Sequence, residues 1–544
     1  MKLLYYGGKL HAEADTPPLR LWLGLIAVSL GVALIVVDLT IVNVILAPII
    51  EDLSITSIEA QWIQESYAIV FAALLLLTGR LADLYGARKL FLVGLFIFGV
   101  TSLFAAAAPN GELLILARFL QGIGGAMILP TSLALVNATF TGKARGQAFA
   151  IWGSTIGAAA AVGPLLGGWL ADFSWRWAFG INIPLVLLIM VGIVVYLPAS
   201  HRIRGRVDWP GAALSVIGLG LLAFALIEGR AHGWLVVTEP LTIGGFAWRT
   251  GPSPVLVAFA AAGIALFVFW RRQVALARAG SEPLMHTGLF AIDSFRRGNV
   301  VTLIVGLGEF GIIAVLPLWL QFTLNYSALQ TGLALVPLAV GSFCASGASF
   351  SMTNAISALG QVRIGLLLEA AGLVLLGWWA AADSSWWSIA AALFVYGIGV
   401  GFATAQVTNV VLADVPVEFS GQGSGIQSTA RELGSALGIA ALTTLFLGTF
   451  GSGLRDRLTD AGAPGPDADR LSAAVTESAG SSIPTLAAEP ATAGVAEAAR
   501  EAMSSGVAVS SYVCAGLLVL ALATTAFVAR STAAVEELVE EPRS

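Results

Sequence analysis

Charged residues are scarce in this chain of 544 residues: Asp, Glu, Lys and Arg make up 11% of it, whereas a soluble protein carries about 25%. Hydrophobic residues make up 57%, and the mean hydropathy is +0.86. This composition excludes an ordinary cytosolic enzyme. It indicates instead a protein with many membrane-spanning helices.

Residues that build metal sites and disulfides are also few. The four histidines lie outside the apolar runs, and the two cysteines, Cys344 and Cys514, lie inside them. No G-x-x-x-x-G-K-[ST] phosphate loop occurs, so ATP is not the expected energy source. We therefore expect no metal, no cofactor and no nucleic-acid partner. An enzyme is the least favoured class, because no nucleophile–base set is evident.

Fourteen apolar runs are long enough to cross a bilayer, which takes about 20 residues per span. The first run is too long for a signal peptide and should remain in the protein. Lys and Arg concentrate in alternate loops, and the positive-inside rule places these loops and both termini in the cytoplasm. The predicted spans are 22–48, 60–78, 90–108, 112–136, 147–171, 177–198, 209–228, 254–270, 299–321, 330–352, 363–381, 386–412, 424–449 and 507–529.

A faint internal repeat divides the chain. Residues 122–126 (GIGGA) match 397–401 (GIGVG), and Gly146-Gln147 matches Gly421-Gln422 at the same offset. The repeat predicts an all-α fold of two six-helix bundles, related by an axis along the membrane normal, plus two inserted helices. The expected divisions are 1–198, the inserted pair 199–297, the second bundle 298–530 and a cytoplasmic tail 531–544.

One long stretch, residues 450–506, is rich in Ala, Ser, Gly and Pro and lies outside in this topology. Long loops are not governed by the charge rule, so its arginines do not contradict the orientation. We expect a loosely ordered external loop. Short helices over 467–478 and 486–504 are the alternative.

The most charged turn, residues 79–89 (GRLADLYGARK), separates two long apolar runs. Such a turn is typical of a membrane surface, where glycines allow a tight bend and basic residues face lipid headgroups. Together with residues 38–43 (DLTIVN), 118–122 (RFLQG) and 163–168 (GPLLGG), it resembles the signatures of the major facilitator superfamily. The resemblance is to the fourteen-span branch of drug:proton antiporters, and it covers most of the chain.

Two acids within the spans are the main candidates for substrate and proton binding. Asp38 is in the middle of span 1, and Glu309 is in span 9, the counterpart of span 1 in the second half. Membrane acids usually face a cavity or a partner, and burial favours the protonated form until a cation arrives. A proton and a cationic substrate would thus compete for one carboxylate. A structural or packing role is the alternative for each acid.

Two further charged residues are candidates for the same task. Glu65, near the outer end of span 2, contacts substrate or reaches outward to water. Arg118 lies about two turns below the outer surface in span 4. The resemblance implies that Arg118 tunes or relays protons, with snorkelling as an equal alternative. Glu369 in span 11 is a weaker candidate, for packing or proton entry.

Residues of the loop and of span 5 are expected to control conformation. Asp83 and Arg88 should contact helix ends and charges on the cytoplasmic face, with a turn-stabilising role as the alternative. The resemblance implies sealing of a leak path by span 5, whose glycines otherwise allow close packing. The full set of expected conformational residues is Gly79, Asp83, Gly86, Arg88, Gly163, Pro164 and Gly167.

The sequence thus predicts a monomeric, multi-pass transporter of the bacterial cytoplasmic membrane. It should export lipophilic, cationic, drug-like compounds in exchange for protons, by alternating access within the lipid bilayer. Export of one specific metabolite or antibiotic is an alternative with the same signatures. A non-transporting receptor or assembly partner is a third possibility, although it would not need acids within the spans.

Overall fold

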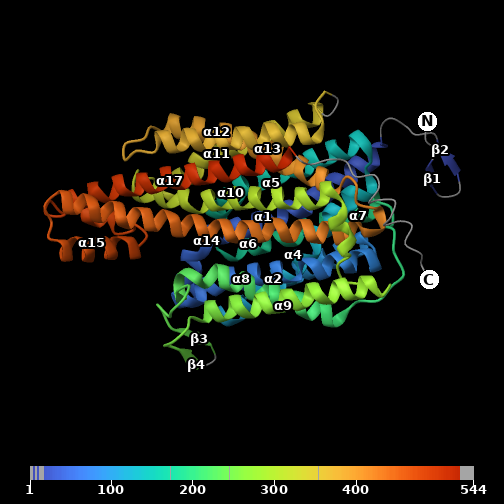
Figure 1. Cartoon of the computed structure of the whole chain (residues 1–544), viewed down its shortest axis with the longest axis horizontal. Helices are drawn as coiled ribbons and strands as arrows, with labels where there is room; N and C mark the ends of the chain where they lie inside the picture. The colour runs from blue at the N-terminus through green and yellow to red at the C-terminus, as the bar shows by residue number, and fades with distance from the viewer. Residues whose placement is uncertain are drawn as a thin grey trace.

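The computed structural model describes residues 4–6, 9–11, 17–171, 173–243, 246–352 and 355–526. Long helices lie side by side along one axis of the molecule (Figure 1). The strands of the described part form two short hairpins, β1 Leu4–Tyr6 with β2 Lys9–His11 and β3 Leu241–Ile243 with β4 Phe246–Trp248. The helices are α1 Leu19–Leu53, α2 Ser57–Tyr85, α3 Ala87–Ala106, α4 Gly111–Thr139, α5 Gly142–Ala171, α6 Arg176–Gly180, α7 Asn182–Tyr196, α8 Trp209–His232, α9 Pro254–Arg278, α10 Asp293–Phe322, α11 Ala328–Met352, α12 Ala358–Trp379, α13 Trp386–Leu412, α14 Ser420–Asp460, α15 Gly465–Glu477, α16 Ile483–Ala488 and α17 Ala493–Thr525.

The predicted spans coincide with helices. Thirteen segments of the described residues are long and apolar enough to cross a membrane, and α6 and α7 together form one of them. The fifth predicted span corresponds to α5, a helix of 30 residues that packs against α1. The chain is therefore an all-helical, multi-pass membrane protein.

The same packing scheme occurs twice. In the first half α1 packs against α5 and α7, and α3 packs against α4 and α7. In the second half α10 packs against α14 and α17, and α12 packs against α13 and α17. Glycines bring the helices together at matching places: Gly124 lies against the backbone of Phe98, and Gly399 lies against that of Glu369.

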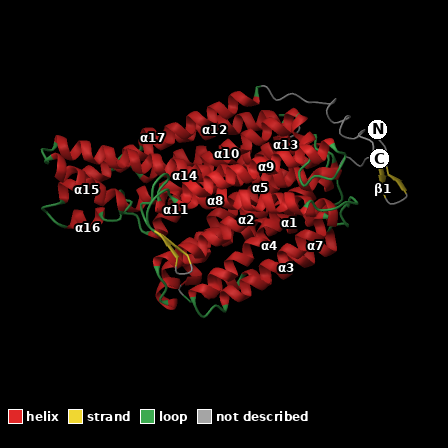
Figure 2. Cartoon of the chain, turned by 60° about the horizontal axis from the view of Figure 1, so that its bottom comes forward, coloured by secondary structure: helices red, strands yellow, loops and turns green. Residues whose placement is uncertain are grey.

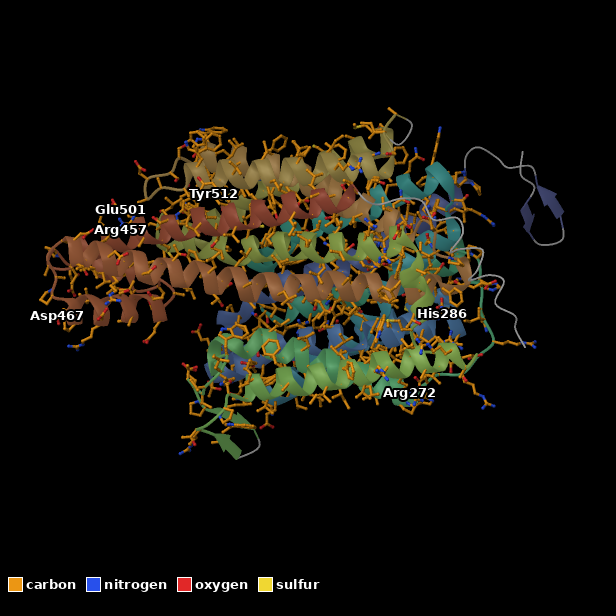
Figure 3. All side chains as sticks on the ribbon, in the orientation of Figure 1. Arg272, His286, Arg457, Asp467, Glu501 and Tyr512 are labelled. Atoms are coloured by element: carbon orange, nitrogen blue, oxygen red, sulfur yellow. The ribbon has the colours of Figure 1, made fainter. Side chains whose placement is uncertain are left out.

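The pair α8 and α9 lies beside the seam between the halves. The two helices pack on each other, and α8 also contacts α2 and α14. Asp208 caps α8 by accepting a hydrogen bond from the N–H of Gly211, and it accepts further bonds from Arg272 of α9. The inserted pair is thus fixed at the end of the bundle where Figure 3 labels Arg272.

The expectation of a loosely ordered loop over residues 450–506 is wrong. Both flanking helices continue into this segment, which also contains α15 and α16 and extends past the bundle (Figure 2). We call residues 450–506 the projection. Its interior is lined by small and large apolar side chains that are fully buried, including Phe450, Leu454, Ala468, Val475, Ile483, Ala496, Ala499, Ala502 and Met503. An ion pair of 3.2 Å between Arg457 and Glu501 joins α14 to α17 on its surface (Figure 3).

Candidate functional site

Asp38 lies near the middle of α1 and is completely buried. Its carboxylate is ion-paired with Arg118 of α4. It also accepts hydrogen bonds from the amide of Gln121, at 3.0 Å, and from that of Asn182, at 3.1 Å. Helices α1, α4 and α7 thus meet at Asp38. The hydrogen-bond donors from α4 and α7 satisfy its carboxylate, as burial of a charged group requires.

Arg118 is fixed by more than the ion pair. Its Nε donates to the carbonyl oxygen of Ile63 at 3.1 Å, and its Nη1 donates to Gln121 Oε1 at 2.6 Å. The guanidinium lies 4.4 Å from the ring centroid of Tyr67. With 1% of its side chain exposed, Arg118 does not snorkel to the surface. That alternative is wrong, because the guanidinium points toward Asp38 instead.

The second half contains a similar pair on different helices. Glu309 of α10 accepts a hydrogen bond of 3.1 Å from Arg431 of α14, and both side chains are buried. Arg431 also lies 5.8 Å from the ring centroid of Phe310. Two more acids, Glu432 and Glu369, lie within electrostatic range of this pair.

Sequence reasoning missed Arg431, although the sequence contains a signal for it. An Arg-Glu dipeptide inside the predicted span 424–449 is as unusual as the acids of spans 1 and 9. It also missed Gln121 and Asn182 as partners of Asp38. Their pairing across α1, α4 and α7 cannot be inferred from the spacing of the residues.

A glycine of a neighbouring helix packs close to Asp38 and to Glu309 in the same way. Gly163 of α5 packs against the carbonyl oxygen of Val37, and Gly438 of α14 packs against that of Leu307. Asp38 directly follows Val37 in the chain, and Glu309 is two residues after Leu307. They do not pair with each other, because each is ion-paired with an arginine of its own half. Glu65 is half-buried on α2, two residues before Tyr67.

At one end of the bundle, which we call the Asp83 end, the two halves are joined. Asp83 of α2 accepts hydrogen bonds from the N–H groups of Gly421, at 2.6 Å, and Gln422, at 2.9 Å. These donors are available because they belong to the first turn of α14. Gly79 allows this contact, since a side chain there would collide with the carbonyl oxygen of Gly421.

Arg88 acts within the first half. Its Nη2 donates to the carbonyl oxygen of Val194 at 2.7 Å, near the end of α7, and its N–H donates to Ser200 at 2.9 Å. Gly86 precedes it with a φ of 90°, a left-handed conformation that favours glycine. The turn thus fixes α3 to α7, whereas Asp83 joins the two halves.

A second set of contacts crosses between the halves at the same end. Arg145 of α5 donates to Asn409, at 3.1 Å, and to the carbonyl oxygen of Ala413, at 3.2 Å. Asn137 donates to Ser420 at 3.2 Å. The sequence suggested none of these pairs, which join residues more than two hundred positions apart.

The glycines of α5 lie against α1. A side chain at Gly163 would overlap the hydroxyl of Thr40, two residues after Asp38. Gly167 is buried on the same helix, and the side chain of Pro164 lies outside the described part of the chain. Tight α1–α5 packing therefore borders the Asp38 site.

The opposite end of the first half is closed by a surface clasp. Asp52 accepts hydrogen bonds from Arg176, at 2.5 Å, and from the indole of Trp175, at 2.9 Å. The hydrogen bond from Arg176 is the main reason that the pKa of Asp52 is lower than its usual value of 3.8. This clasp ties the end of α1 to the start of α6.

The described residues contain no group of three or more His, Cys, Asp and Glu side chains that could bind a metal ion. The two buried ion pairs of the core join carboxylates to guanidiniums. The carboxylates can exchange protons and bind cations, whereas an arginine side chain stays protonated.

Comparisons with known proteins agree with this architecture. Residues 28–439 match the family model of the Major Facilitator Superfamily. The chain is 32% identical to the multidrug efflux pump LfrA of Mycolicibacterium smegmatis over 519 residues, which cover 94% of this chain and 97% of that protein. It is also 32% identical to the probable actinorhodin transporter of Streptomyces coelicolor over 484 residues, 85% of this chain and 80% of that protein.

Solved structures show the same fold at low identity. The human organic anion transporter MFSD10 superposes with a TM-score of 0.60 and 15% identity, covering 94% of this chain and 100% of that one. The proton:xylose symporter XylE superposes with a TM-score of 0.59 and 13% identity, covering 95% of this chain and 99% of that one.

Proposed function

Because this chain belongs to the Major Facilitator Superfamily, we propose that it is a drug efflux transporter that exports lipophilic cations in exchange for protons. Relatives that are named as multidrug or antibiotic export proteins support the efflux function. Proton exchange and the cationic substrate are supported by the chemistry of the site. The observation that carries them is a buried acid–arginine pair in each half, with a close glycine contact beside each acid.

The buried pairs supply a competition between three cations. In the absence of ligand each carboxylate is neutralised by its arginine, at a considerable desolvation cost. A proton or a cationic drug that reaches Asp38 replaces Arg118 as its partner. The carboxylate can neutralise only one cation at a time. Binding of a proton to the carboxylate therefore displaces the drug, and binding of the drug displaces the proton.

The joint between the halves supports a mechanism of alternating access. Asp83 and Arg145 join the halves at the Asp83 end, which the charge pattern predicts to be cytoplasmic. Opening that end requires these bonds to break, and rocking of the halves would then expose the acids to the cytoplasm. The two glycines at the joint, Gly79 and Gly421, let the backbones of α2 and α14 approach each other closely.

The test is transport of ethidium by purified protein in proteoliposomes with an imposed pH gradient. We compare wild type with Asp38→Asn and use Asp52→Asn as the matched control, since it makes the same substitution on the same helix at its exposed end. Gradient-driven transport in wild type and the control, but not in Asp38→Asn, is the expected result. Unchanged transport in Asp38→Asn would contradict the role of this carboxylate.

Other results distinguish the alternative functions. Transport of a single antibiotic without competition from other cations would indicate a specific exporter. A protein that transports no tested compound, with or without the projection, would favour a receptor or assembly partner. We expect a monomer. We also expect both termini in the cytoplasm, and tags attached to the two termini should then be accessible only from that side.

A further inference from the structure

Glu369 is a buried acid that the exchange mechanism above does not use. It lies at the centre of α12, with none of its side chain exposed. Neither carboxyl oxygen has a hydrogen-bond partner within the described part of the chain. An ionised carboxylate in such a place is far more costly than a neutral acid. The surroundings of Glu369 therefore favour its neutral form.

The fold does not require an acid at this position. Gly399 packs against the backbone of Glu369 and the carbonyl oxygen of Gly365, as Gly124 packs against Phe98 and Gly94 in the first half. Glu369 and Phe98 thus occupy equivalent places, and both are fully buried. Because phenylalanine satisfies this packing in one half, the carboxyl of Glu369 needs another explanation.

The neighbours of Glu369 connect it to the acid–arginine pair of its half. The ionisable groups that interact electrostatically with it are Glu309 of α10, Arg431 of α14, Tyr396 of α13 and Cys514 of α17, and α12 packs directly against α13 and α17. The hydroxyl of Tyr396 is also buried without a hydrogen-bond partner among the described residues. Arg431 is the cation of this group, and in this conformation it is paired with Glu309.

We propose that Glu369 is a proton-binding site that alternates with Glu309 as the partner of Arg431. In the described state Arg431 pairs with the Glu309 carboxylate and the proton resides on Glu369. In the alternate state Arg431 pairs with the Glu369 carboxylate, and Glu309 receives the proton or binds the cationic substrate. When substrate occupies Glu309, the proton of Glu369 leaves to water. Charge and atoms balance in both cases, and Glu432, near Arg431 and Glu309, adjusts the same equilibrium.

This inference rests on the proposed exchange function, but its first test does not need a substrate. Full-length protein in nanodiscs at neutral pH is examined by infrared spectroscopy for the C=O band of protonated carboxyl groups. We expect Glu369→Gln to lose one band that is present in wild type and in Glu497→Gln, an exposed control on the projection. We expect Glu309→Gln to weaken the same band, because Arg431 is then free to pair with the Glu369 carboxylate. An unchanged band in Glu369→Gln would overturn the proposal.

The second test measures protons released when ethidium binds in weakly buffered solution. Glu369→Gln should release one proton fewer per bound ethidium than wild type, and Glu369→Asp should restore it. Equal release from wild type and Glu369→Gln would overturn the proposal. Glu369→Leu, which gives this position an apolar side chain as in the first half, checks that any loss is not a folding defect. If wild type neither binds nor transports ethidium, the exchange function fails, while the infrared band still decides whether Glu369 carries a proton.

Discussion

The carboxylate of Asp83 accepts a hydrogen bond of 2.6 Å from the N–H of Gly421, 338 residues later in the chain. A charged acceptor at the first turn of a helix is favoured by both the free N–H groups and the helix dipole. This contact therefore stabilises the conformation in which the Asp83 end is closed. The Asp83 contact depends on one side chain and on backbone donors that only a proline in α14 would remove, and the bonds of Arg145 and Asn137 cross between the halves beside it.

We predict that Asp83→Asn shifts the population toward an open Asp83 end. Spin labels at Lys143→Cys and Val417→Cys, in a chain with Cys344 and Cys514 replaced by alanine, report the distance between the halves there. The distance distribution should be broader and longer in Asp83→Asn. The control is Asp293→Asn, because the ion pairs of Asp293 stay within α10. An identical distribution in Asp83→Asn would show that the joint does not depend on this carboxylate.

The spans and the two acids within them could be predicted from the sequence, because apolar runs are long and charges within them are rare. Long apolar stretches locate the spans, and acids within them are few enough that Asp38 and Glu309 stand out. The partners of these acids were not predicted. Arg118 and Arg431 come from helices that are not equivalent in the two halves, and no local spacing encodes a contact between distant helices.

The helices of the projection were not predicted, because this segment was expected to be a loosely ordered loop. The segment is rich in Ala, Ser, Gly and Pro, a composition that resembles a loop, and its buried face includes alanines such as Ala496, Ala499 and Ala502. Alanine nevertheless has the highest helix propensity, and small side chains allow the helices to pack closely. Composition alone therefore underestimated the order of this segment.

The glycines of α5 offer a matched pair of substitutions. Gly163 packs against Thr40, whereas a side chain at Gly168 meets nothing within 4 Å. We expect Gly163→Ala to lower the unfolding temperature and to abolish transport, because α1 must move away next to Asp38. Gly168→Ala should be neutral or stabilising by up to about 1 kcal/mol. Thermal unfolding in detergent and ethidium transport measure both. Equal effects of the two changes would refute the role of α1–α5 packing.

The clasp at Asp52 should make stability depend on pH in a defined direction. Its pKa is lowered in the folded protein, chiefly by the hydrogen bond from Arg176. The stabilisation is therefore fully present above the unfolded value near 3.8 and is lost as the pH falls through the folded value. We expect wild type to unfold at a higher temperature than Asp52→Asn at neutral pH, with a gap that shrinks in acid below 3.8. A gap that does not change with pH would show that the carboxylate charge contributes nothing.

A double-mutant cycle on Asp38 and Arg118 separates stability from transport. Removing one partner of a buried ion pair leaves an unpaired charge and costs about 3–5 kcal/mol. Arg118→Gln should therefore destabilise the protein strongly. Asp38→Asn should cost less than this, because Arg118 keeps the carbonyl oxygen of Ile63, the amide oxygen of Gln121 and the ring of Tyr67 as partners.

The double variant Asp38→Asn/Arg118→Gln contains no buried charge at this site, so its unfolding temperature should recover most of what Arg118→Gln loses. Proton-driven transport should not recover, because the carboxylate that binds both cations is absent. Recovery of both properties would mean that the pair serves packing alone, and coupling would then reside in the second half at Glu309. Loss of both, with no recovery of stability, would instead indicate that Gln121 and Asn182 require the Asp38 carboxylate to keep α1, α4 and α7 together.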